Sequence, residues 1–118
     1  MGVCIFMKKY YFIVLTALLT ACSAKLIAPT QTDVDRVATT YPGYSLADLN
    51  QGKMLFGQTC NRCHPLKSPT GHNADQWKDI VPKMVARLNK KKGEVVVNEG
   101  QQELILRYLV TMSGAPRH

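Results

Sequence analysis

The sequence contains few of the residue patterns that enzymes use. It has three histidines and eight acidic residues among 118, and no histidine stands near paired carboxylates. A nucleophile motif and a glycine-rich phosphate-binding loop are also missing. Basic residues are not interleaved with aromatic ones in the manner of nucleic-acid-binding surfaces. These absences argue against an enzyme, a small-molecule substrate and a nucleic-acid partner.

No hydrophobic run is long enough for a comfortable membrane span. An apolar run over residues 10–19 follows two lysines and precedes two small residues and Cys22. This order is typical of an export signal, and its end resembles the bacterial lipoprotein box, in which the cysteine is lipid-modified and becomes the first mature residue. We therefore expect residues 1–21 to be a signal peptide and Cys22 to be lipidated. An ordinary secretory signal and an uncleaved anchor are the alternatives.

This prediction places the mature chain outside the cytoplasm, anchored to a bacterial membrane and facing the periplasm. Ser23, which follows the lipidated cysteine, permits sorting to an outer membrane. Met7 stands directly before the two lysines, so translation starts at Met1 or at Met7. Cleavage leaves roughly 100 residues, enough for one small domain.

The sequence has only four cysteines, and two of them form its most informative motif. Cys60, Cys63 and His64 have the Cys-x-x-Cys-His spacing that attaches a c-type haem. The two thiols form thioethers with the haem, and the adjacent histidine becomes the proximal iron ligand. With Cys4 in the signal and Cys22 lipidated, no cysteine remains for a disulfide. We expect one covalently bound haem c, containing iron, per chain.

Two other functions of the motif fit less well. A thioredoxin-type redox pair needs a strand-helix-strand context, which the sequence does not show. A closed zinc site needs more ligands than His64 and the distant His72 supply.

The mature chain divides into a tether over residues 22–44 and a domain over residues 45–118. The tether is rich in threonine, alanine and proline, and about 20 flexible residues span roughly 25 Å. In the domain, three capping boxes followed by apolar stripes predict three helices, so the predicted fold is all-α. Pro82 should kink or divide the second helix, and residues 95–97 form at most a short strand without a partner. The boxes pair Ser45 with Asp48, Asn73 with Gln76 and Asn98 with Gln101.

From residue 45 to residue 114 the chain resembles the small single-haem class I cytochromes c. The resemblance is carried by residues 52–56 before the haem motif and by residues 104–109 near the end. It implies crossed N- and C-terminal helices around one haem, with Gly52 at the crossing and Phe56 near Tyr108.

The family also places a proline after the motif, whose carbonyl accepts a hydrogen bond from the proximal histidine. Pro69 is the best match and Pro65 the alternative. Such a bond orients the imidazole and strengthens it as a ligand.

The sixth iron ligand is less clear from the sequence. A methionine sulfur raises the haem potential for electron transfer, and Met84 precedes the last helix, as the family's ligand does. Met112 lies at the end of that helix. His72 would give a bis-histidine haem, and an open site is the remaining alternative. We expect Met84 to be the distal ligand.

Other side chains are weaker candidates for the haem site. Trp77 contacts a haem propionate or packs in the core, with equal weight for the two roles. Arg62 and Arg87 neutralise propionates or lie in solvent, and a solvated role is favoured. The net charge is +7. The one dense run of basic residues is the three lysines at 90–92, and it is more consistent with a solvated loop than with a docking patch.

The expected function is a membrane-anchored one-electron carrier that serves redox proteins in or at the membrane. A haem protein that binds gas or peroxide, including an enzyme of that kind, and a haem subunit of a larger respiratory complex are the alternatives.

Overall fold

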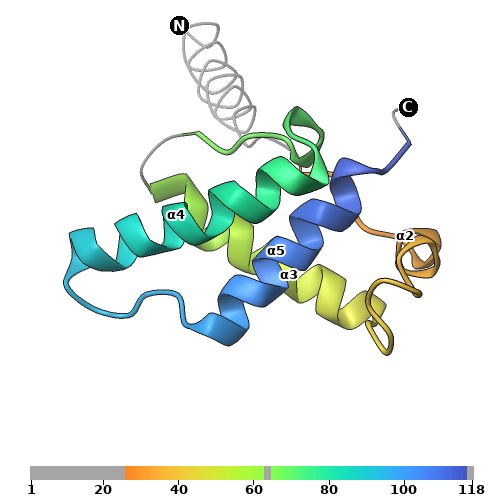
Figure 1. Ribbon diagram of the computed structural model, residues 1–118, viewed down its shortest axis with the longest axis horizontal. Helices are drawn as coiled ribbons and strands as arrows, with labels where there is room; N and C mark the ends of the chain where they lie inside the picture. The colour runs from red at the N-terminus through yellow and green to blue at the C-terminus, as the bar shows by residue number, and fades with distance from the viewer. Residues whose placement is uncertain (1–25, 63–64, 117–118) are drawn as a thin grey trace, which may run out of the picture.

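The structure, a computed structural model, describes residues 26–62 and 65–116. Within these two ranges the chain is all-helical and contains no strand, which confirms the predicted all-α class (Figure 1). The short strand considered for residues 95–97 does not form. The elements are α2 (Gln31–Arg36), α3 (Leu46–Thr59), the 3-10 turns η2 (Cys60–Arg62) and η3 (Pro69–Gly71), α4 (Ala74–Lys92) and α5 (Glu99–Ser113).

Reciprocal capping boxes begin α3, α4 and α5 at the positions that the sequence predicts. In the last of them the Asn98 side chain accepts a hydrogen bond from the Gln101 backbone at 2.9 Å, and the Gln101 side chain accepts one from the Asn98 backbone at 3.0 Å. Each box satisfies backbone donors that the first helical turn leaves without partners. The three helix starts are therefore fixed by local sequence.

The helices α3 and α5 cross at close range (Figure 1). A Cβ atom added to Gly52 would overlap the Leu104 carbonyl oxygen and would lie 2.8 Å from the Tyr108 Cβ. The Phe56 and Tyr108 rings lie nearby, with centroids 6.1 Å apart. Only glycine permits this approach of two helix backbones, so the predicted crossing and its residues are confirmed.

The core lies where α4 packs against this crossing. Fully buried side chains come from all three long helices, and the largest are Trp77, Tyr108, Phe56, Leu49, Ile105, Leu109 and Met112. Burial of this apolar surface is the main term that stabilises the three-helix arrangement.

One continuous helix of 19 residues, α4, runs through Pro82. The predicted division into two helices is wrong. Proline removes one hydrogen bond to the carbonyl of residue 78, but both residues are exposed, so water can reach that carbonyl. Trp77, Val81 and Val85 are buried on both sides of the proline, and their packing in the core favours a continuous helix.

Part of the segment that the sequence predicts as a tether is folded against the domain. The short helix α2 begins at a capping box between Thr30 and Asp33. Arg36 pairs with Asp33 at 2.9 Å and donates a hydrogen bond to the Thr111 carbonyl at 2.8 Å. Burial by itself would raise the pKa of Asp33, but hydrogen bonds from Thr30 and Arg36 outweigh it and lower that pKa. The helix is thereby fastened to the end of α5.

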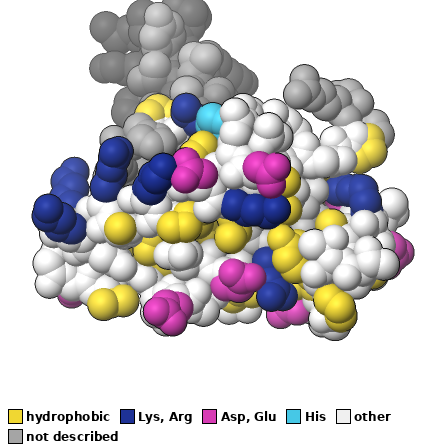
Figure 2. Space-filling view, in the orientation of Figure 1, with side chains coloured by type: hydrophobic (Ala, Val, Ile, Leu, Met, Phe, Trp, Pro, Cys, Tyr) yellow, Lys and Arg dark blue, Asp and Glu magenta, His cyan; other side chains and the backbone are white. Residues whose placement is uncertain are grey.

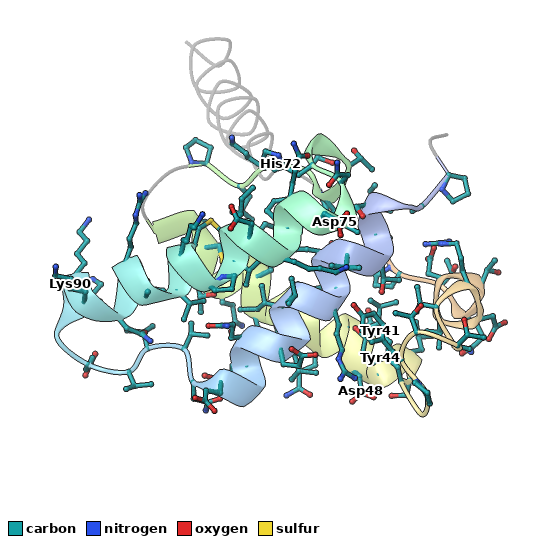
Figure 3. All side chains as sticks on the ribbon, in the orientation of Figure 1. Tyr41, Tyr44, Asp48, His72, Asp75 and Lys90 are labelled. Atoms are coloured by element: carbon teal, nitrogen blue, oxygen red, sulfur yellow. The ribbon has the colours of Figure 1, made fainter. Side chains whose placement is uncertain are left out.

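Two tyrosines in the connection between α2 and α3 also attach this segment to α5, which carries Arg107. The Arg107 guanidinium lies 4.8 Å from the Tyr41 ring centroid and 5.8 Å from that of Tyr44. Figure 3 shows both rings beside Asp48, where α3 begins. Tyr44 is buried, and its burial raises its pKa above the ordinary range.

Candidate functional site

The first cysteine of the motif caps α3. Cys60 donates its backbone N–H to the Phe56 carbonyl, and η2 continues from it. Its Sγ lies 3.7 Å from the Thr59 hydroxyl oxygen. Cys63 and His64 lie outside the described residues, as does Cys22, so their predicted roles stay predictions.

Two adjoining cavities open at Cys60. The first has a volume of about 280 Å³ and the second about 250 Å³. Cys60 and Met84 line both of them. The first is also lined by Thr59, Val85, Arg87, Leu88, Lys91 and Val97, and the second by Phe56, Leu66, Lys67, His72, Trp77 and Ile80.

The two cavities have the chemistry that a haem requires. Apolar side chains dominate both linings, which suits the hydrophobic macrocycle. Three cationic side chains stand among them: Arg87 and Lys91 in the first cavity and Lys67 in the second. Arg87 and Lys91 are exposed and can meet propionate groups at the edge of the site. The residues present therefore fit a haem bound at Cys60.

The three candidate distal ligands lie in different surroundings. Met84 is half-buried and lines both cavities. His72 is half-buried, lines the second cavity and meets Trp77 edge-on, with ring centroids 4.8 Å apart; Figure 3 shows it near the start of α4. Met112 is fully buried among core residues. The structure thus brings Met84 and His72 to the site, whereas Met112 fills the core of the three-helix packing.

Trp77 and Pro69 interact directly, an arrangement that the sequence analysis did not foresee. The indole Nε1 donates a buried hydrogen bond of 2.8 Å to the Pro69 carbonyl oxygen. The indole N–H is therefore used inside the protein, which favours the packing role of Trp77 over a propionate contact. The carbonyl oxygen keeps a second lone pair with which it can accept another donor. Pro65 precedes this segment in a stretch without regular structure.

The basic run of residues 90–92 belongs to the last turn of α4 and not to a loop. Figure 2 shows lysine and arginine side chains gathered at this end of the molecule. Positive charge at a helix C-terminus interacts favourably with the helix dipole. Lys91 also lines the first cavity and Lys67 lines the second, and the sequence analysis named neither as a site residue. Lys67 stands three residues after His64, so its nearness to the motif was visible in the sequence, whereas Lys91 is brought to Cys60 only by folding. The Arg62 side chain lies outside what the structure describes.

Comparison with family models, curated proteins and solved structures found no match to this chain. In the described part of the chain, no three His, Cys, Asp or Glu side chains form a metal-binding group. Among the same residues, no helix is both long enough and apolar enough to cross a bilayer.

Proposed function

We propose that this protein is a lipid-anchored, one-electron carrier with a single covalently bound c-type haem, exported to the periplasmic side of a bacterial membrane. The observation that carries the proposal is the meeting of two apolar cavities at Cys60 and Met84. Cys60 begins a Cys-x-x-Cys-His motif, and Met84 supplies the soft sulfur that favours a high haem potential. Cys60 and Cys63 would hold the group by thioethers, and His64 and Met84 would ligate its iron.

The bound haem would supply reversible one-electron chemistry at its iron. The chain's own residues determine how favourable that chemistry is. Apolar side chains such as Phe56, Ile80 and Leu88 exclude water and lower the local dielectric constant, which tunes the potential. Arg87 and Lys91 would offset the negative charge of the haem propionates. Trp77 holds the Pro69 carbonyl in place, and this carbonyl is the proposed acceptor for the proximal histidine.

Covalent haem is the first expected result. One haem per chain should remain with the polypeptide after acid-acetone extraction, and the intact mass should exceed that of the polypeptide by one haem. The variant Cys60→Ala should retain at most one thioether and should give a poor yield of holoprotein. Ser68→Ala, an exposed loop substitution, is the control and should leave the yield unchanged. Haem that extracts freely from the unsubstituted protein would contradict the assignment.

Lipidation at Cys22 gives a second expected result. Cys22→Ser should move the protein from the membrane fraction to the soluble periplasmic fraction without changing its haem spectrum, because two or three acyl chains suffice for stable anchoring. Cys4→Ser is the matched control, since Cys4 belongs to the predicted signal, and it should leave the protein in the membrane. An unsubstituted protein that is already soluble would show that the anchor prediction is wrong.

A further inference from the structure

Leu26, which contacts the domain, stands only a few residues after the proposed lipid anchor. The described residues start at Leu26, four positions after Cys22. Four residues of extended chain span at most about 14 Å. Since residues 30–44 are folded against the domain and do not extend as a tether, the surface around Leu26 has little freedom to move away from the bilayer.

Leu26 and Ile27 are held against the helix crossing. The Leu26 Cδ1 lies 3.6 Å from the position of a Cβ added to Gly57 on α3. The Tyr108 hydroxyl donates a long hydrogen bond of 3.5 Å to the Ile27 carbonyl, and burial raises the pKa of this tyrosine to about 12. The hydroxyl therefore keeps its proton, and with it the contact, throughout the physiological range. The chain leaves the proposed anchor and meets the outside of α3 at once.

The outside of α3 there forms an open groove of about 410 Å³, which we call the α3 groove. It is lined by Leu26, Asn50, Lys53, Met54, Gly57 and Gln58. Met54 is 51% exposed, and Ile27, next to Leu26, is 41% exposed. The lining contains one cation and no acidic residue. Exposed apolar side chains beside a lysine match the boundary between lipid headgroups and acyl chains.

We propose that the α3 groove rests on the phospholipid surface, with Met54 and Ile27 inserted at the headgroup boundary and Lys53 near lipid phosphates. This inference rests on the proposed lipid anchor at Cys22 and adds an orientation to it. Met54 and Phe56 are two positions apart, so their side chains point about 200° apart around α3. Phe56 lines the second cavity. Met54 and Phe56 therefore lie on different sides of α3, and the insertion of Met54 leaves the Phe56 side of the helix off the bilayer.

The experiment compares the depth of two exposed apolar positions in the acylated holoprotein. Met54→Cys and Val95→Cys each receive a nitroxide label; Val95 is 74% exposed and lies in the connection between α4 and α5. The protein is reconstituted into vesicles of phosphatidylethanolamine and phosphatidylglycerol. The ratio of collisions with oxygen to collisions with a water-soluble nickel complex should be severalfold higher at Met54 than at Val95, because oxygen concentrates in the bilayer. The unsubstituted protein controls for labelling of other cysteines.

The outcomes separate the groove from the anchor. An acylated protein with equal ratios at the two labels overturns the membrane-facing groove and leaves the anchor in place. Absence of acyl mass contradicts the anchor and the groove proposal together. In the Cys22→Ser protein without vesicles, the label at Met54 should collide freely with the nickel complex. If those collisions stay rare, a second copy or another protein covers the groove, and the proposal is overturned.

Discussion

Replacing Gly52 with alanine is expected to destabilise the protein more than any other single methyl addition. The new Cβ would overlap the Leu104 carbonyl oxygen on α5 and would lie 2.8 Å from the Tyr108 Cβ. Both are rigid parts of a helix, so α3 and α5 must separate to admit it. We expect a loss of about 3 kcal/mol or more in the free energy of unfolding, at the upper end of overpacking effects. Thermal denaturation followed by circular dichroism should show a melting temperature lower by more than about 10 °C.

Gly57→Ala is the matched control on the same helix. A Cβ there would meet only the flexible end of the Leu26 side chain, at 3.6 Å. Alanine is the better helix former by up to about 1 kcal/mol, so this variant should be as stable as the parent or slightly more stable. Equal melting temperatures for the two variants would contradict the close helix crossing.

Replacing Met84 with alanine is expected to change the iron site more than any other substitution in α4. The oxidised parent protein should show the weak red-edge absorption band of a sulfur-ligated haem, and Met84→Ala should lose it. Without sulfur ligation the reduction potential should fall by a measurable part of the roughly 0.8 V over which axial ligands tune haems. The variant should also bind carbon monoxide, whereas the parent should not.

Two controls separate ligation from packing. Met112→Leu conserves volume at a fully buried position, so it should keep the band and cost less than about 1.5 kcal/mol. His72→Ala alters the other candidate that lines the second cavity and should keep the band as well. A haem ligated by His72 would be bis-histidine and would lack the band in the parent, so a parent without the band would contradict ligation by Met84. Rapid carbon monoxide binding by the parent would favour the gas-binding or peroxide-binding alternative over the carrier.

The helix starts were predictable because the signals that set them are local. Asn73 with Gln76 and Asn98 with Gln101 are capping boxes within four residues, and each begins its helix as expected. Thr30 with Asp33 is a box of the same kind, but no long apolar stripe follows it, so α2 escaped prediction. Its position depends on the contact of Arg36 with the distant Thr111 carbonyl.

Other features depended on packing that the sequence does not display. Pro82 was expected to kink or divide the helix, and α4 is not divided: it continues through the proline, with its buried face packed in the core. The motif singled out Cys60 and the order of elements singled out Met84, and their roles at a haem stay predictions. That both residues line the same two cavities depends on how the chain folds, which the sequence does not display. The Trp77 hydrogen bond to Pro69 joins two side-by-side segments whose pairing no local pattern specifies.

A single amide side chain, that of Asn89, binds the connection between α4 and α5 through three hydrogen bonds. The Asn89 Nδ2 donates to the Val97 carbonyl at 3.0 Å, and its Oδ1 accepts from the backbone of Val96 at 2.9 Å and of Val97 at 3.1 Å. Sliding or rotation of α4 relative to this connection would break all three bonds. Met84 lies on the same helix, five residues earlier, so these hydrogen bonds also restrict the movement of its sulfur. In the proposed electron carrier, a Met84 sulfur held in this way would exchange slowly and move little between oxidation states, and the reorganisation energy of electron transfer would be small.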